Sequence, residues 1–158
     1  MPARLQKVPI DIERIRELVP HAGTMCLLER VIDYSAHSIH CRTRSHADPA
    51  NPLRRSGHLS SVCGIEYAAQ AMALHDALKH SFTTETQAKS SKLGRPRHGY
   101  LVSVRQVDCH TRYLDTIAAA LDVRADHVFG DASGMVYSFK VNAGEILLIT
   151  GRASVMLG

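Results

Sequence analysis

Residues 57–78 read GHLSSVCGIEYAAQAMALHDAL, and from residue 59 onward this stretch predicts one long helix. Apolar or small residues occur on nearly every side of that helix instead of on one stripe, which is the pattern of a buried helix. Polar residues such as Glu66, Gln70 and Asp76 interrupt the apolar run that a membrane span needs. The rest of the chain is therefore expected to wrap the helix with protein.

The flanking sequence predicts how it does so. Residues 10–18 have the spacing of a short amphipathic helix, and residues 25–34 and 37–46 read as strands. After the long helix, four further strands are expected at residues 98–111, 116–128, 135–142 and 145–156, separated by short turns. This order predicts an α+β domain in which an antiparallel sheet curls around one buried helix. The polar residues 81–97 are expected to form a loop within that domain.

Length and composition limit the class of protein. The 158 residues are 45% apolar and 22% charged, which predicts a single soluble domain over residues 1–158. The N-terminus lacks the apolar core of a secretory signal, so a cytoplasmic location is expected. Four scattered cysteines are expected to be reduced, buried and not zinc ligands. A net charge of +4 favours an acidic partner, but few aromatic residues and no reading motif argue against nucleic acid.

One carboxylate stands out on the long helix. Glu66 has Gln70 one turn later and Cys63 one turn earlier on the same face. A carboxyl on an apolar helix is desolvated, which suits a general acid. The alternative is that Glu66 has a buried partner or turns to solvent.

Three phrases carry a resemblance to a known family. Residues 18–33, LVPHAGTMCLLERVID, resemble the opening of the hotdog-fold 3-hydroxyacyl-acyl-carrier-protein dehydratases, and EYAAQ at residues 66–70 matches the motif on their central helix. NPLRRSG at residues 51–57, with GIEYAAQAMA at residues 64–73, is more similar to the predicted dehydratase branch of aryl-polyene pathways. The resemblance implies a hotdog fold, a dimer and active sites at the subunit interface.

It also implies a mechanism. In that family a loop histidine removes the proton on C2 of the thioester, and the helix carboxyl of the other subunit protonates the departing hydroxyl, a role that falls to Glu66. The family's His-Phe-Pro phrase has no equivalent here, so His46 and His58 are the candidates for the base. We favour His46, because strand end, histidine, proline-rich loop, glycine and helix follow in the family's order. No metal or redox cofactor is expected, since the elimination needs a base, an acid and carbonyl polarisation.

The remaining predictions concern substrate binding. Backbone N–H groups around residues 61–64 are expected to be free to polarise the thioester carbonyl, with Gly64 favoured. The predicted substrate-binding set is Gly64, Gln70, Cys63, His58, Arg54 and Arg55. Cys63 also suits a core position, and the arginines also suit a solvated face. Two other histidines receive structural roles, His21 in the turn before the first strand and His75 near the end of the helix.

The sequence thus predicts a dehydratase that converts a 3-hydroxyacyl thioester, delivered by acyl carrier protein or coenzyme A, to the trans-2-enoyl product. A homodimer is expected, with a heterodimer with a related dehydratase as the alternative, and neither nucleic acid nor membrane is an expected partner. Two rival functions remain. The same fold hosts acyl thioesterases, and a non-catalytic subunit would keep the binding surface without the chemistry.

Overall fold

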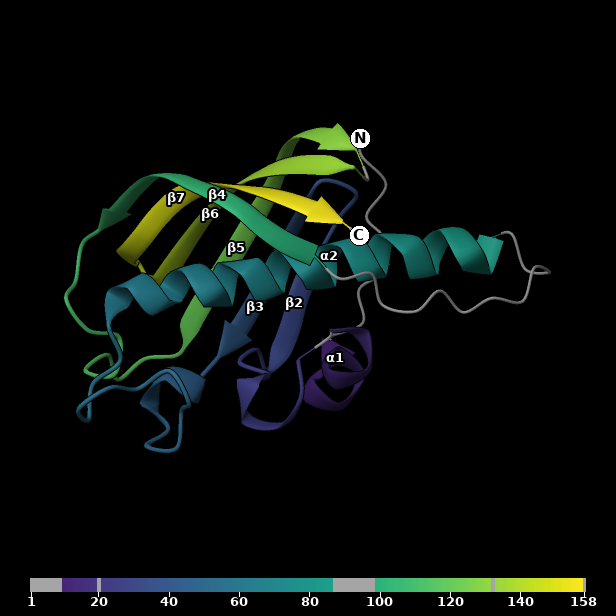
Figure 1. The fold of residues 1–158 in the computed structure, drawn as a ribbon. Coiled ribbons are helices and arrows are strands. Elements are labelled where there is room, and N and C mark those ends of the chain that lie inside the picture. Colours follow the sequence, from purple (N-terminus) through teal and green to yellow (C-terminus); the bar gives the residue numbers. More distant parts are fainter. Residues whose placement is uncertain (1–9, 20, 87–98, 132, 158) are drawn as a thin grey trace.

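The structure, a computed structural model, describes residues 10–19, 21–86, 99–131 and 133–157. Seven antiparallel strands form one sheet in the order β1-β2-β3-β5-β6-β7-β4, and the sheet curves around a long helix (Figure 1). The strands are β1 (Ile10–Asp11), β2 (Arg30–Tyr34), β3 (Ser38–Thr43), β4 (Gly99–Cys109), β5 (Leu121–Asp131), β6 (Gly134–Ala143) and β7 (Ile146–Leu157). The helices are α1 (Ile12–Leu18) and α2 (Gly64–Thr86), with 3-10 turns at Gly23–Met25, Ser45–Ala47 and Ser61–Cys63. This arrangement confirms the predicted hotdog fold.

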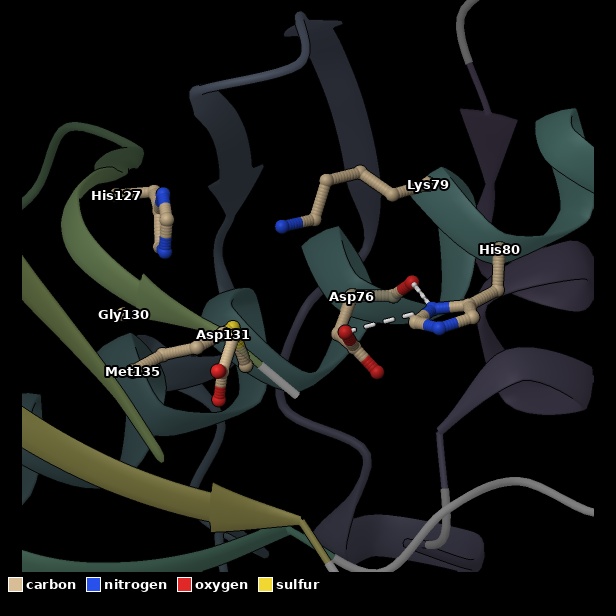
Figure 2. A pocket seen from close by; sticks show the side chains of 7 residues that line it. All are labelled: Asp76, Lys79, His80, His127, Gly130, Asp131 and Met135. Atoms are coloured by element: carbon tan, nitrogen blue, oxygen red, sulfur yellow. Dashed lines mark hydrogen bonds and ion pairs between the residues drawn. The ribbon is translucent and has the colours of Figure 1, made fainter. Parts of the chain in front are cut away.

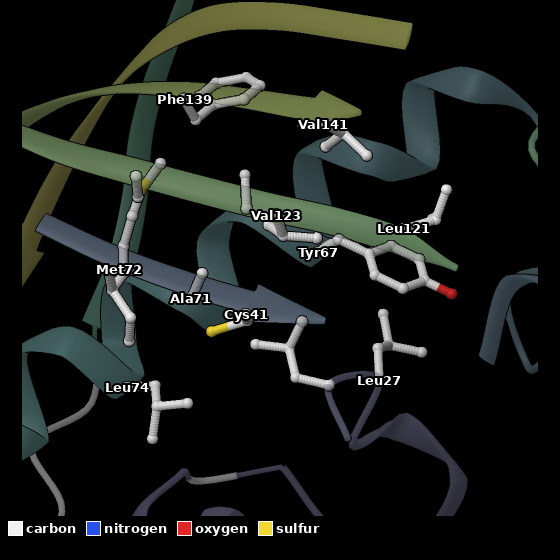
Figure 3. Packing of buried hydrophobic residues seen from close by; sticks show 14 of the residues in the cluster. Leu27, Cys41, Tyr67, Ala71, Met72, Leu74, Leu121, Val123, Phe139 and Val141 are labelled. Atoms are coloured by element: carbon white, nitrogen blue, oxygen red, sulfur yellow. The ribbon is translucent and has the colours of Figure 1, made fainter. Parts of the chain in front are cut away.

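The core lies between α2 and the concave face of the sheet (Figure 3). Side chains alternate across a strand, so every second residue of β5 and β6 points inward. Val123 and Val141 are buried in this way, in the same apolar cluster as Tyr67, Ala71 and Leu74 of α2. Burying each large apolar side chain contributes about 1.5–3 kcal/mol to the free energy of folding. The helix is therefore held in place mainly by its apolar contacts with the sheet.

The long helix begins and ends later than the sequence predicted. Leu59 pairs instead with the segment after β4, because its N–H donates to Asp115 and its carbonyl accepts from Leu114. Ser60 then caps the 3-10 turn that precedes Gly64. At the other end α2 runs to Thr86, so the start of the predicted loop at residues 81–97 is helical, and residues 87–98 lie outside the described residues.

The first predicted strand is shorter than expected, since only Arg30–Tyr34 of residues 25–34 pair as β2. The reason is that side chains take the main-chain groups of Leu27. Its N–H donates to Gln70 Oε1 at 2.9 Å, and its carbonyl accepts from the hydroxyls of Thr43 at 2.6 Å and Ser45 at 2.7 Å. Those bonds fix the segment against α2 instead of extending the strand.

Two predictions from composition are also tested. All four cysteines are free thiols, but Cys109 is exposed and Cys63 only partly buried, so the prediction of four buried cysteines is wrong for these two. Within the described part of the chain, no helix is long and apolar enough to cross a membrane.

Candidate functional site

Glu66 lies in the first turn of α2, where two side chains hold its carboxylate. Its Oε1 is 3.1 Å from Nε2 of His21 and 3.2 Å from Nε2 of Gln70. The Glu66 side chain remains 34% exposed, so a substrate can reach the carboxyl. The sequence predicted a desolvated carboxyl, which the single chain does not provide at this position.

His21 is the residue that sequence reasoning missed. Its side chain is 28% exposed, and its imidazole bonds Glu66. In the described part of the chain, Nδ1 of His21 is buried without a hydrogen-bond partner. The prediction for His21 was a structural role in the turn. The only available signal was its place in the Pro-His-Ala-Gly phrase, because no local pattern reveals a contact with α2.

Gln70 joins the site to the segment before β2. Its Nε2 donates to Met25 O at 2.7 Å and to Glu66 Oε1 at 3.2 Å, while its Oε1 accepts from Leu27 N–H at 2.9 Å. The side chain is 1% exposed. Both of its N–H groups are used within the chain, so Gln70 supports the carboxylate and offers no free donor to a substrate.

The start of α2 does not provide the predicted free N–H groups. Ser61 N–H donates to Arg112 O, Val62 N–H to Ser60 Oγ, and Cys63 N–H to Ser60 O. Gly64 N–H bonds the carbonyls of the preceding 3-10 turn. The prediction that the N–H groups of residues 61–64 are free is therefore wrong, because the turn uses these donors itself.

Gly64 has a packing role instead. A Cβ at this position would lie 3.0 Å from Ile149 Cγ2 and 3.7 Å from Val141 Cγ2. The missing side chain therefore allows the first turn of α2 to approach β6 and β7 closely. This contact sets the position of Glu66, two residues later.

His46 is fully buried in the 3-10 turn after β3. Its Nε2 lies 3.0 Å from Ile117 O, so this nitrogen carries the proton and Nδ1 is left as the acceptor, buried without a partner in the described chain. Burial lowers the pKa of His46, which keeps the ring neutral near pH 7. No hydrogen bond or ion pair joins His46 to Glu66 within the described residues of one chain.

His58 is fixed at the surface beside the start of α2. A turn pairs it with Arg55, and its Nδ1 is 3.2 Å from Asp115 Oδ2. Its ring stacks on Tyr113, with the ring centroids 4.4 Å apart. Desolvation alone would raise the pKa of Asp115, but the hydrogen bonds from the Leu59 N–H and from His58 stabilise the carboxylate and lower that pKa overall. His58 is thus held firmly, but by a different carboxylate from Glu66.

The other predicted binding residues are partly committed within the chain. Arg54 donates to the carbonyls of His46 and Gly57, and Arg55 to those of Pro52 and Arg54, so both brace the loop before α2. Burial raises the pKa of the Cys63 thiol, which disfavours the thiolate that a nucleophile requires. Arg55 remains exposed and accessible to a ligand.

A separate hollow of about 290 Å³ lies further along α2, between the helix and the β5–β6 hairpin (Figure 2). It is lined by Asp76, Lys79, His80, His127, Gly130, Asp131 and Met135. The nearby His75, predicted to cap the helix, is fully buried and bonds Tyr137 and Ser35 O at 2.8 Å each. That prediction is wrong, because α2 continues past His75. In the described residues, no group of three His, Cys, Asp or Glu side chains is placed to hold a metal.

The chain matches the family model described as ApeP-like, ApeP dehydratase, over residues 13–157. It belongs to the ApeP-like dehydratase family. This assignment confirms the predicted relation to a hotdog dehydratase of the aryl-polyene type. No functionally curated protein matches the chain.

Solved structures show how widely the fold of this chain is shared. The dehydratase heterocomplex ApeI:P from Xenorhabdus doucetiae superposes with a TM-score of 0.72 and 22% identity, covering 91% of this chain and 90% of that one. A homologue of HP0420 from Helicobacter felis superposes with a TM-score of 0.60 and 12% identity, covering 93% of this chain and 89% of that one. A mutant of the thioesterase PA1618 from Pseudomonas aeruginosa superposes with a TM-score of 0.54 and 10% identity, covering 81% of this chain and 79% of that one. At these identities the similarity establishes the fold alone.

Proposed function

We propose that this ApeP-like dehydratase is one domain that converts a 3-hydroxyacyl thioester to the trans-2-enoyl thioester. The observation that carries the proposal is the Glu66 carboxyl, which is held by His21 and Gln70 and remains accessible. A fold shared with thioesterases does not choose a reaction, so the proposal rests on this side chain and on the family.

Glu66 takes the part of the general acid. In the elimination a base removes the proton on C2, the electron pair of that C–H bond forms the C2–C3 double bond, and the C3 hydroxyl leaves as water after Glu66 protonates it. The bonds from His21 and Gln70 hold one carboxylate oxygen, which leaves Oε2 to face the hydroxyl. The proton taken from C2 then returns to Glu66 through solvent.

His46 is the proposed base. Its ring is kept neutral by burial, and the Ile117 carbonyl fixes the tautomer in which Nδ1 accepts a proton. Because no contact joins it to Glu66 within the described chain, the proposal places His46 and Glu66 on two different subunits. His21 is the alternative base, since it contacts Glu66 directly and is partly exposed.

The edge strand β4 is where we place the second subunit. Among the described residues β4 pairs on one side only, with β7, so its other edge presents main-chain groups that no described strand uses. Tyr100, Leu101 and Val102 are all exposed on it, and Met156 of β7 is exposed beside them. A second subunit that pairs along this edge covers the apolar side chains.

The partner subunit is either a second copy or a related dehydratase. The match to the dehydratase heterocomplex ApeI:P supports the second arrangement, in which this chain supplies Glu66 to one site and His46 to the other. We propose an acyl carrier protein or coenzyme A as the carrier of the acyl chain, with Arg55 as a contact for its phosphate, because that guanidinium is exposed beside the start of α2.

The decisive experiment follows enoyl formation and thiol release together. The protein alone, and mixed with a related dehydratase, is incubated with a 3-hydroxyacyl thioester. The proposal expects enoyl absorbance without thiol release, and the Glu66→Gln variant should abolish it. Thiol release without enoyl product would identify a thioesterase. Failure of both preparations to form the enoyl thioester would refute the dehydratase proposal.

A further inference from the structure

The outward face of the sheet carries a band of positive charge that the proposed chemistry does not use. We define this band as Arg124 of β5, Lys140 of β6, Arg152 of β7 and Arg105 of β4, all of them exposed. The residues beside them in each strand, such as Val123, Phe139 and Ala153, are buried against α2. Because side chains alternate along a strand, the four cations point away from the core and from Glu66.

The strand register places these cations against one another. Arg124 is the direct cross-strand partner of Lys140, and Arg105 is the direct partner of Arg152. Ser138 pairs with Arg152 two residues from Lys140, so the two pairs are diagonal neighbours. The band therefore runs without a break across β5, β6, β7 and β4, a width of about 14 Å. Like charges placed directly opposite each other destabilise a sheet, so this pattern carries a cost.

On the same face, between β3 and β5, other basic side chains are paired with a carboxylate. Asp122 lies 2.6 Å from His40 Nε2 and 3.0 Å from Arg42 Nε. By contrast, none of the four band side chains makes a hydrogen bond or an ion pair with any described residue. Asp126 and Asp108, both of them described, share the face with the band but form no ion pair with it. Within the described part of the chain, the four cations are therefore not paired with carboxylates.

We propose that the band is a docking surface for a partner protein whose surface is rich in carboxylates. The outward positions around it include Ser103, Ser138, Thr150 and Ser154, and the same face also carries the exposed aromatic side chains of Tyr100 and Phe129, so the choice of partner rests on charge. Asp108, Asp122 and Asp126 on the same face repel a continuous phosphate backbone, whereas a protein surface with mixed charges accommodates them. A rigid sheet face with these charges therefore fits an acidic protein better than nucleic acid.

The first test measures binding of a fluorescein-labelled oligoglutamate peptide to the full chain by anisotropy at low salt. Wild type should bind, and the affinity should fall as salt rises. Lys140→Glu and Arg152→Glu should each bind roughly tenfold more weakly. Arg14→Glu, the same charge change on α1, should bind within about twofold of wild type, because Arg14 is exposed but distant in sequence and already paired with Glu17.

A second measurement separates docking from misfolding. Lys140→Glu places a carboxylate opposite Arg124, so its melting temperature should rise by about 1–3 °C while peptide binding weakens roughly tenfold. A substitution that stabilises the fold and weakens binding is expected if the like-charge pair is kept for a ligand. Unchanged peptide binding in this variant, or tighter binding of wild type to duplex DNA than to the peptide, would overturn the proposal. Both readouts are independent of enoyl formation, so their failure is distinguishable from failure of the proposed function.

Discussion

Nε2 of His21 lies 3.1 Å from Oε1 of Glu66, which joins the segment before β2 to the first turn of the central helix. The second bond to the same oxygen comes from Gln70. The carboxylate is therefore held from its own helix and from a separate segment, while its side chain stays accessible. This arrangement gives each of the three side chains a distinct expected phenotype.

Replacing Glu66 with Gln should remove the acid without removing its hydrogen bonds. We expect kcat/KM for enoyl formation to fall by about 10²–10⁴, the usual contribution of a general acid. The melting temperature should stay close to that of wild type, because an amide can still bond His21. Glu13→Gln, an exposed carboxylate on α1, is the matched control and should retain full turnover.

Substitutions of His46 and His21 should reduce turnover by different amounts. His46→Ala should abolish turnover if His46 is the base, whereas His21→Ala should lower it only about tenfold, as expected for a residue that orients Glu66. A mixed-subunit assay gives the control. Glu66→Gln and His46→Ala chains, each inactive alone, should recover activity when combined if the two residues act across an interface. Full loss in His21→Ala with normal turnover in His46→Ala would reverse the assignment.

Gln70→Ala should destabilise the fold as well as the site. The change leaves the buried N–H of Leu27 and the carbonyl of Met25 without their partner. We expect the free energy of unfolding to fall by about 2–4 kcal/mol, measured by urea denaturation. Gln70→Met, which keeps the volume but not the hydrogen bonds, should show a similar loss. A midpoint equal to wild type in both variants would contradict the supporting role.

Stability should fall in mild acid through His75. Burial lowers the pKa of this histidine from 6.5 to about 4, so the unfolded chain takes up a proton at a higher pH than the folded one. The stability contribution is full above pH 6.5 and is lost as the pH falls towards 4, by about 3 kcal/mol in total. His75→Gln should flatten this part of the urea-unfolding profile. An identical slope in wild type and variant between these pH values would refute the prediction.

Gly64→Ala tests how closely α2 packs on the sheet. The new Cβ would meet Ile149 Cγ2 at 3.0 Å, so we expect a loss of about 1–3 kcal/mol and reduced turnover through a displaced Glu66. The loss should shrink in an Ile149→Ala background, which a double-mutant cycle measures. Gly134→Ala, where a Cβ meets nothing within 4 Å, should be neutral.

The sequence predicted the parts of the fold that depend on local periodicity. Apolar residues on all sides of residues 59–78 indicated a buried helix, and the turns between the later segments indicated the strands that include β5 and β6, where Val123 and Val141 are buried. The spacing of Glu66 and Gln70 correctly placed them on one helical face, where they bond each other. These features need no knowledge of contacts between distant segments.

What the sequence missed depends on such contacts. The bond from His21 to Glu66 exists because Gln70 holds the preceding segment by its main chain. The helix start was misplaced because Asp115, far along the chain, pairs with Leu59. The N–H groups of residues 61–64 looked free only because Ser60 and Arg112 were not recognised as their acceptors. The roles of His46 and Glu66 in catalysis stay predictions.

Gln70 grips the segment before β2 through the carbonyl of Met25 and the N–H of Leu27, and not through either side chain. Hydrogen bonds to main-chain atoms depend on the path of the backbone and not on which side chains the segment carries. The half-buried Met25 is therefore open to replacement by smaller or larger side chains without loosening the carboxylate.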